Sequence, residues 1–263
     1  MEILNDFADL LLPLKGVLAA CAVLVVLMLV LRACFGKGSK INRAVSAAVA
    51  ILLMYVLAVI LHCTGKKYDI LLSGLPLVTV SGSQIRLLSV QNTDFPVLCG
   101  ALLKTLTLAL LVTGFDSAFS KNQKFIFWLL NRCLVVACAG LSQLLVCWLF
   151  ERILPPAVLE YAPMILLGAL VVTMLLGALK LLLGIALAVV NPIIAALYTF
   201  FFASKIGKTL SRAVLTTVIL TVLMAAAEQL GFVSLSMVGA NALTFLLPVA
   251  VLFGVWYIPT KVL

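Results

Sequence analysis

Apolar blocks of about 20 residues recur along this 263-residue chain, separated by short polar stretches. A helix rises about 1.5 Å per residue, so a block of this length spans a hydrocarbon core about 30 Å thick. With 65% hydrophobic and 10% charged residues and a mean hydropathy of +1.30, the chain has more apolar surface than a water-soluble fold can bury. We therefore predict an all-α, polytopic transmembrane bundle, with residues 1–263 as one integral membrane domain in a lipid bilayer.

The number of blocks predicts about seven crossings, within a range of six to eight. Proline and small polar clusters mark the ends of several blocks, as at Pro155-Pro156. The predicted crossings are residues 16–35, 44–62, 97–115, 125–154, 162 to about 190, 213–230 and 237–258.

Lysine and arginine residues predict the orientation, because positive charge collects in cytoplasmic loops. The best agreement places the N-terminus outside and the C-terminus in the cytoplasm. The net charge of +9 is scattered over short loops instead of forming one patch, so we expect no nucleic-acid partner. The residues assigned to the inside are Arg32, Lys37, Lys40, Arg43, Lys121, Lys124, Lys205, Lys208, Arg212 and Lys261, and those assigned to the outside are Lys15, Lys66, Lys67, Arg86 and Arg152.

The longest polar interval, residues 64–96, is predicted to be an extracytoplasmic loop. Within it, apolar and polar residues alternate around Ser81-Gly82 in the stretch LPLVTVSGSQIRLLSV. This pattern indicates a β-hairpin, and an amphipathic interfacial segment is the alternative. Cys63 and Cys99 flank the loop and would form a disulfide only if their Cα atoms lay within about 7 Å of each other.

Residues 162–203 contain one charged residue, Lys180. As a single helix this run would be about 63 Å long, roughly twice the hydrocarbon thickness. Asn191-Pro192 is the natural break, because proline removes a backbone donor and disfavours helix in the residue before it. We favour one crossing followed by a broken or re-entrant segment near Asn191-Pro192, with two crossings through a turn near Lys180 as the alternative.

Four charged residues are candidates for charges embedded in the apolar blocks: Lys104, Arg132, Lys180 and Glu228. Placing a charge in the hydrocarbon region costs at least about 2.5–3.5 kcal/mol, so such a residue faces the bundle interior, a partner or water. Lys104, Arg132 and Glu228 lie within a few turns of a block end, and snorkelling to the headgroups is the simpler expectation for them.

Lys180 lies deep in its run and close to the predicted break at Asn191-Pro192. Together these residues, with Arg132 and Glu228, have the ingredients of a transport or channel site. The alternative is that Lys180 marks a cytoplasmic interface and that Pro192 only kinks the helix.

Motifs for common catalytic chemistry are absent from the sequence. His62 is the only histidine, so an HExxH zinc site cannot form, and neither a GxSxG stretch nor a phosphate-binding GxGxxG or Walker A loop occurs. We therefore expect no catalytic residues, no metal and no cofactor.

Residues 23–61, VLVVLMLVLRACFGKGSKINRAVSAAVAILLMYVLAVIL, resemble the N-terminal membrane region of the CvpA-like (colicin V production) family. The likeness lies in a long apolar helix that ends in basic residues, followed by Asn42-Arg43 and a helix rich in small residues. Alanines stand here where that family has glycines, and more crossings follow. The resemblance implies a multi-pass protein of the bacterial inner (cytoplasmic) membrane, linked to export or envelope maintenance, with no catalytic residues to transfer.

Three classes of function remain. The first is a non-enzymatic structural or accessory component of a membrane assembly, which packs against other subunits or against copies of itself. The second is a transporter or channel subunit that uses Lys180, Asn191 and Pro192. The third, an intramembrane enzyme, needs paired titratable groups for which this chain has little material.

The orientation is testable with the single-cysteine substitutions Lys37→Cys, Lys66→Cys and Lys205→Cys, labelled with a membrane-impermeant maleimide on intact and on permeabilised cells. We expect positions 37 and 205 to react from the same side and position 66 from the other, because basic loops stay in the cytoplasm. The unsubstituted protein controls for its own cysteines. Labelling of positions 37 and 205 from opposite sides would overturn the seven-crossing topology.

Overall fold

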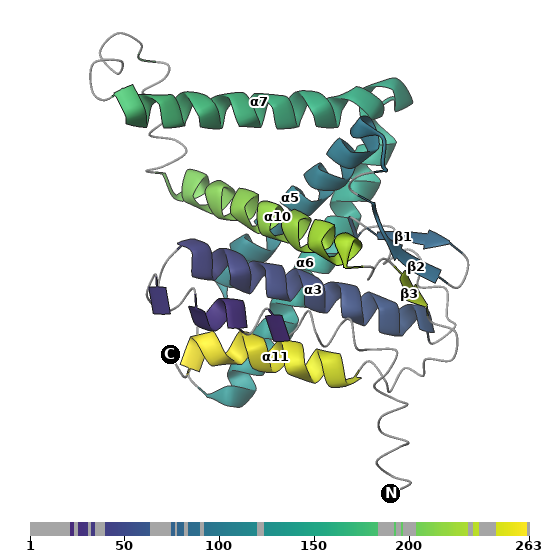
Figure 1. Cartoon of the computed structure of the whole chain (residues 1–263), viewed down its shortest axis with the longest axis vertical. Coiled ribbons are helices and arrows are strands. Elements are labelled where there is room, and N and C mark those ends of the chain that lie inside the picture. Colours follow the sequence, from purple (N-terminus) through teal and green to yellow (C-terminus); the bar gives the residue numbers. More distant parts are fainter. Residues whose placement is uncertain are drawn as a thin grey trace, which may run out of the picture.

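The computed structural model is predominantly helical, and the helices form one bundle (Figure 1). The residues that it describes are 22–23, 26–30, 33–34, 40–63, 75–76, 78–81, 84–89, 92–119, 124–183, 192, 196, 204–230, 234–236 and 246–261. The main helices are α3 (Lys40–Cys63), α5 (Phe95–Ala118), α6 (Phe125–Ile153), α7 (Pro156–Leu183), α10 (Lys205–Gln229) and α11 (Leu246–Lys261).

Five of these helices, α3, α5, α6, α7 and α10, are long and apolar enough to cross a membrane, and α11 is shorter. The prediction of an all-α membrane bundle is confirmed. These six helices correspond to six of the seven predicted crossings. Most of the first predicted crossing, residues 16–35, lies outside the described residues, so the number seven stays a prediction.

Local chemistry accounts for several helix ends. α6 ends at Ile153, one residue before Pro155-Pro156, as predicted. The N–H of Leu154, between them, donates to the carbonyl of Phe150 at 3.0 Å. α7 begins at Pro156, where the missing N–H costs nothing because the first turn has no acceptor for it. Ser204 caps α10 by accepting a hydrogen bond from the N–H of Gly207 at 2.9 Å.

α3 is the central helix of the bundle and packs against α5, α6, α10 and α11. Its small side chains let the neighbouring backbones approach closely, as the sequence predicts. Large side chains such as Ile51 and Leu53 are also fully buried and fill the space between the helices. The buried alanines of α3 are Ala44, Ala47, Ala48, Ala50 and Ala58.

Chain direction alternates from helix to helix. In Figure 1, α3, α6 and α10 begin at the left or lower left, and α5, α7 and α11 end on that side. We call this side the arginine end, because Arg43, Asp116, Arg212 and Trp256, from four of these helices, line one cavity there. α10 therefore begins on the side where α7 ends.

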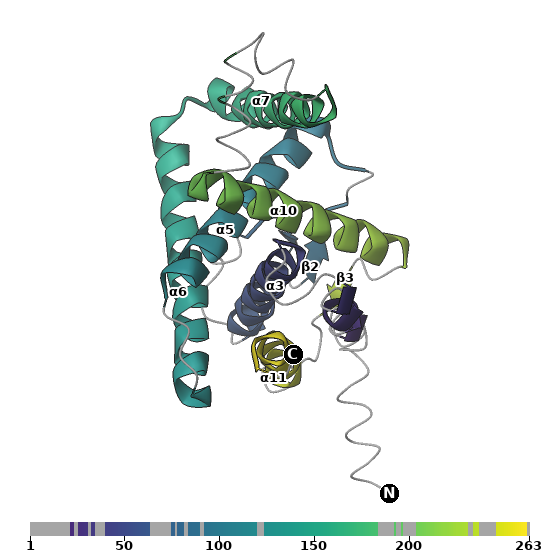
Figure 2. The same ribbon diagram turned by 90° about the vertical axis from the view of Figure 1, so that its left-hand side faces the viewer.

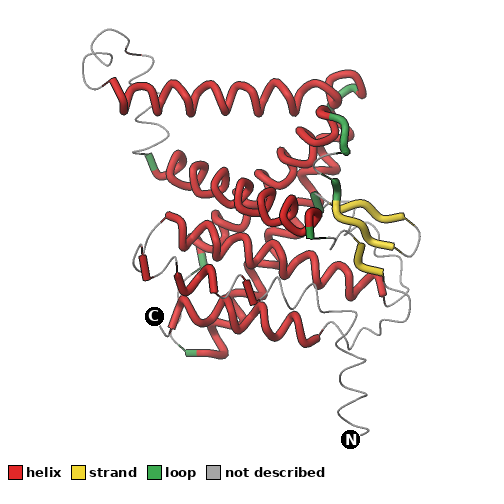
Figure 3. Tube along the Cα trace, viewed as in Figure 1, coloured by secondary structure: helices red, strands yellow, loops and turns green. Residues whose placement is uncertain are grey.

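Three short strands lie at the opposite end, which we call the sheet end (Figure 3). β1 (Val78–Ser81) and β2 (Gln84–Leu87) form an antiparallel hairpin in which Ser81 faces Gln84 across the turn. β3 (Ser234–Ser236) adds to the other side of β2, with Gln84 opposite Ser236. Of the two forms considered for residues 64–96, the structure has the hairpin.

α7 lies at the edge of the bundle. Its main contact is with α5, and no residue of its spanning segment whose burial the structure describes is buried. In Figure 2 it is seen almost end-on at the top, whereas α6 stands upright along the left side of the view. Side chains such as Ile165, Val171 and Leu175 are more than half exposed, so most of the circumference of α7 faces lipid or another protein.

Candidate functional site

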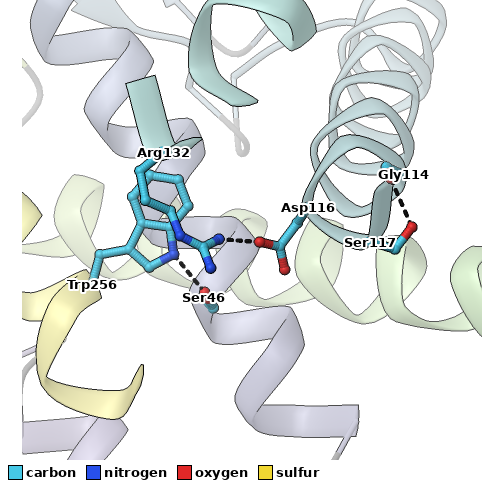
Figure 4. Close-up of polar contacts among 6 residues, drawn as sticks. All are labelled: Ser46, Gly114, Asp116, Ser117, Arg132 and Trp256. Carbon is cyan, nitrogen blue, oxygen red and sulfur yellow. Dashed lines mark hydrogen bonds and ion pairs between the residues drawn. The ribbon is translucent and has the colours of Figure 1, made fainter. Parts of the chain in front are cut away.

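Arg132 is the most buried charged side chain among the described residues, at 6% exposed. It lies in the early turns of α6 and forms an ion pair with Asp116, in the last turn of α5 (Figure 4). Asp116 is about 30% exposed, so the pair joins a buried cation to a partly exposed carboxylate. The expectation that Arg132 snorkels to the headgroups is wrong, because its guanidinium is turned inward.

Two tryptophans complete the surroundings of Arg132. Its guanidinium carbon lies 4.8 Å from the ring centre of Trp256 in α11 and 5.8 Å from that of Trp128 in α6. The indole N–H of Trp256 donates to the hydroxyl of Ser46 in α3 at 2.7 Å. We call these five residues, Arg132, Asp116, Trp128, Trp256 and Ser46, the Arg132 cluster; it joins four helices.

Burial of a guanidinium is unfavourable unless charge and hydrogen bonds compensate for the lost water. Asp116 supplies the opposite charge, and the aromatic faces supply cation–π attraction, which strengthens where water is excluded. Only part of the donor capacity of Arg132 is used, because its buried Nε has no hydrogen-bond partner. The cluster therefore fixes how α5, α6 and α11 meet.

A cavity of about 310 Å³ lies beside the Arg132 cluster at the arginine end. α3 contributes Arg43 and Ser46, α5 contributes Asp116 and α10 contributes Arg212. Arg43 is exposed and Arg212 is half-buried, so the cavity opens toward the end of the bundle. Its lining combines three charged side chains with hydroxyl groups.

Glu228, another candidate from the sequence, lies near the other end of α10. It accepts a hydrogen bond from the hydroxyl of Ser89, in the segment between β2 and α5. The same hydroxyl accepts from the N–H of Asn92 at 3.1 Å. Glu228 therefore ties the end of α10 to the start of α5, and the structure does not bring it to Arg132.

The structure describes only part of the predicted transport site at Lys180, Asn191 and Pro192. Lys180 lies in the last described turn of α7, and the course of its side chain lies outside the described residues. Asn191 is also outside them, while Pro192 is helical and exposed. The predicted broken or re-entrant segment therefore stays a prediction.

Asp116 and Trp256 were not identified from the sequence as partners of Arg132, nor was Ser46 as the partner of Trp256. One signal was available, because Asp116 precedes Arg132 by sixteen residues across a short interhelical loop. An acid in the last turn of one helix and a base in the early turns of the next are neighbours when the helices are antiparallel. The contribution of Trp256, which lies more than 100 residues later, required the tertiary structure.

The cysteines and carboxylates do not form a site within the described residues. Cys99 is a free, buried thiol, so the disulfide with Cys63 that the sequence left open is not formed. The described part of the chain also contains no group of three or more His, Cys, Asp and Glu side chains that could hold a metal ion.

Comparisons with family models, with curated proteins and with solved structures each return no match. The fold and the site thus define the chain at the level of class: it is a membrane protein built from several apolar helices, with a paired arginine in its interior.

The Arg132–Asp116 contact is testable by a double-mutant cycle with Asp116→Asn, Arg132→Gln and the double variant. We expect each single variant to lower the free energy of unfolding by about 1–3 kcal/mol, since one partner is left without its ion pair. The double variant should lose less stability than the sum of the two single losses, because each single variant already breaks the ion pair and the pair can be lost only once. Reversible unfolding in detergent, followed by tryptophan fluorescence, measures this. Strictly additive losses would contradict the contact.

Proposed function

We propose that this protein is a non-enzymatic, structural or accessory component of a membrane assembly. The observation that carries the proposal is the state of Arg132: its charge is buried, ion-paired and covered by Trp128 and Trp256. A charge that serves a transport pathway faces water or a substrate. Arg132 instead holds helices together, and so does Glu228 through Ser89.

α7 supports the second part of the proposal, the contact with another subunit. A helix that packs mainly on α5 leaves a broad surface for association within the membrane. Gly168 lies on the exposed part of α7, and a Cβ atom added there would meet nothing within 4 Å. Small residues at such positions let a partner helix approach closely, because van der Waals contact drives association in lipid.

The cellular setting rests on the sequence. The resemblance of residues 23–61 to the CvpA-like family favours the bacterial cytoplasmic membrane and an assembly for export or envelope maintenance. Arg43 and Arg212 lie at the arginine end, where α3 and α10 also begin with a lysine and α11 ends with one. This concentration of positive charge supports a cytoplasmic location of the arginine end.

Gly168→Leu tests the subunit contact. Leucine fits the isolated chain at this position but fills the space a partner helix needs, and overpacking costs about 1–3 kcal/mol. We expect the fraction of protein in the larger assembly to fall about tenfold, with an unchanged melting temperature. Native mass spectrometry after extraction in mild detergent measures both the assembly and the free chain.

Gly254→Leu is the matched control. Gly254 of α11 is also exposed, and a Cβ atom there would also meet nothing within 4 Å. This variant should keep the assembly. If Gly168→Leu and Gly254→Leu behave alike, or if the unsubstituted chain is monomeric in native membranes, α7 does not mediate association.

A transporter or channel subunit is the second candidate. α10 begins on the side where α7 ends, which supports one crossing over two for residues 162–203 (Figure 1). The hypothesis adds the predicted broken or re-entrant segment near Asn191-Pro192. Broken helices of this kind surround substrate and ion sites in many transporters. Lys180, in the last described turn of α7, precedes the predicted break at Asn191-Pro192.

Lys180→Gln separates the two candidates. Under our proposal, proteoliposomes with the unsubstituted protein and with the variant are equally tight to protons and to chloride, as measured with pH- and chloride-sensitive dyes. A leak through the unsubstituted protein that Lys180→Gln abolishes, at an unchanged melting temperature, would favour the transporter instead.

A further inference from the structure

The cavity at the arginine end carries an excess of positive charge. Its charged lining residues are Arg43, Arg212 and Asp116. Arg132 does not line the cavity but forms an ion pair with Asp116. Asp116 is ion-paired with Arg132 and also attracts Arg212, so a single carboxylate faces three arginines and an excess of positive charge remains. Among the described residues, neither Arg43 nor Arg212 has an ion-pair partner.

Arg43 and Arg212 are close enough to repel each other electrostatically. They come from different helices, α3 and α10, which pack together through the buried Ala44 and Thr216; the hydroxyl of Thr216 donates to the carbonyl of Ala44 at 3.2 Å. The helix packing therefore holds two like charges beside one cavity. An anion between them would turn this repulsion into attraction.

Hydrogen-bond donors are also left over in the cavity wall. The Nε of Arg212 is buried and has no partner. The hydroxyl of Ser46 accepts from Trp256 and keeps its own proton for donation. Thr113 and Ser117, by contrast, donate to carbonyls of their own helix at 2.8 and 2.7 Å. The unused donors, on Ser46 of α3 and Arg212 of α10, thus belong to the same two helices as the arginines without an ion-pair partner.

The size of the cavity limits what can occupy it. At about 30 Å³ for each water molecule, 310 Å³ has room for a compact group of several heavy atoms with some water. Planar guanidinium groups match the oxygens of a phosphate with two parallel hydrogen bonds each. A phosphate, with a charge of up to about −2, also balances two arginines better than a carboxylate does.

We propose that this cavity binds a phosphate group, held by the guanidinium groups of Arg43 and Arg212 and by the hydroxyl of Ser46. The arginine end is where helices begin and end, which is the depth of lipid headgroups in a bundle of this kind. The phosphate therefore belongs either to a small soluble anion or to the headgroup of an anionic phospholipid, and the recognition chemistry is the same.

The test uses the full-length protein in two arms. In the first, inorganic phosphate is titrated into detergent-solubilised protein and binding is followed by isothermal calorimetry. In the second, the protein is placed in nanodiscs of phosphatidylcholine with increasing phosphatidylglycerol, and retained lipid is measured by native mass spectrometry. Binding in the first arm identifies a small anion, and selective retention in the second alone identifies a headgroup.

Arg43→Gln and Arg212→Gln should each weaken binding at least about tenfold in the arm that gives a signal, because each removes a charge-assisted hydrogen bond. Lys208→Gln is the matched control: it removes the same charge from an exposed position of α10 that does not line the cavity. Arg43 is exposed, so its variant keeps the test valid if Arg212→Gln is unstable. Absence of binding in both arms, or equal losses in Arg43→Gln and Lys208→Gln, overturns the proposal.

Discussion

A polar group of a chain in lipid is costly unless it finds a partner within the protein, since hydrocarbon offers no hydrogen bonds. Backbone groups meet this requirement by forming helices, which explains why apolar blocks become α3, α5, α6, α7 and α10. A side-chain charge meets it only through specific neighbours. Arg132 does so with Asp116 and two indole rings, and in doing so it joins helices from three separate parts of the sequence.

α3 connects this interior contact to the cavity beside it. Its alanines allow close packing, and Ser46, one turn away from Arg43, holds Trp256 in place over Arg132. Ser46 also lines the cavity. Ser46 therefore contributes both to helix packing and to the proposed phosphate site. The packing of α3 against α10 also determines where Arg43 and Arg212 lie.

The sequence was sufficient for the features that depend on local pattern. Block length gave the helices, Pro155-Pro156 marked the end of α6, and alternation around Ser81-Gly82 indicated the hairpin. It was insufficient for Arg132, because snorkelling and burial differ only in which face of α6 meets α5 and α11. Hydrophobic blocks this uniform carry little information about faces, so Asp116 and Trp256 emerged only from the packing.

The third strand connects parts of the chain that are made at different times. β3 pairs with β2, yet α5, α6, α7 and α10 are all synthesised between the two strands. Until residue 236 exists, the hairpin has an open edge with unpaired backbone groups. Completion of the sheet therefore comes late in biogenesis, after α10, and it closes the chain between these two points into a ring held by backbone hydrogen bonds.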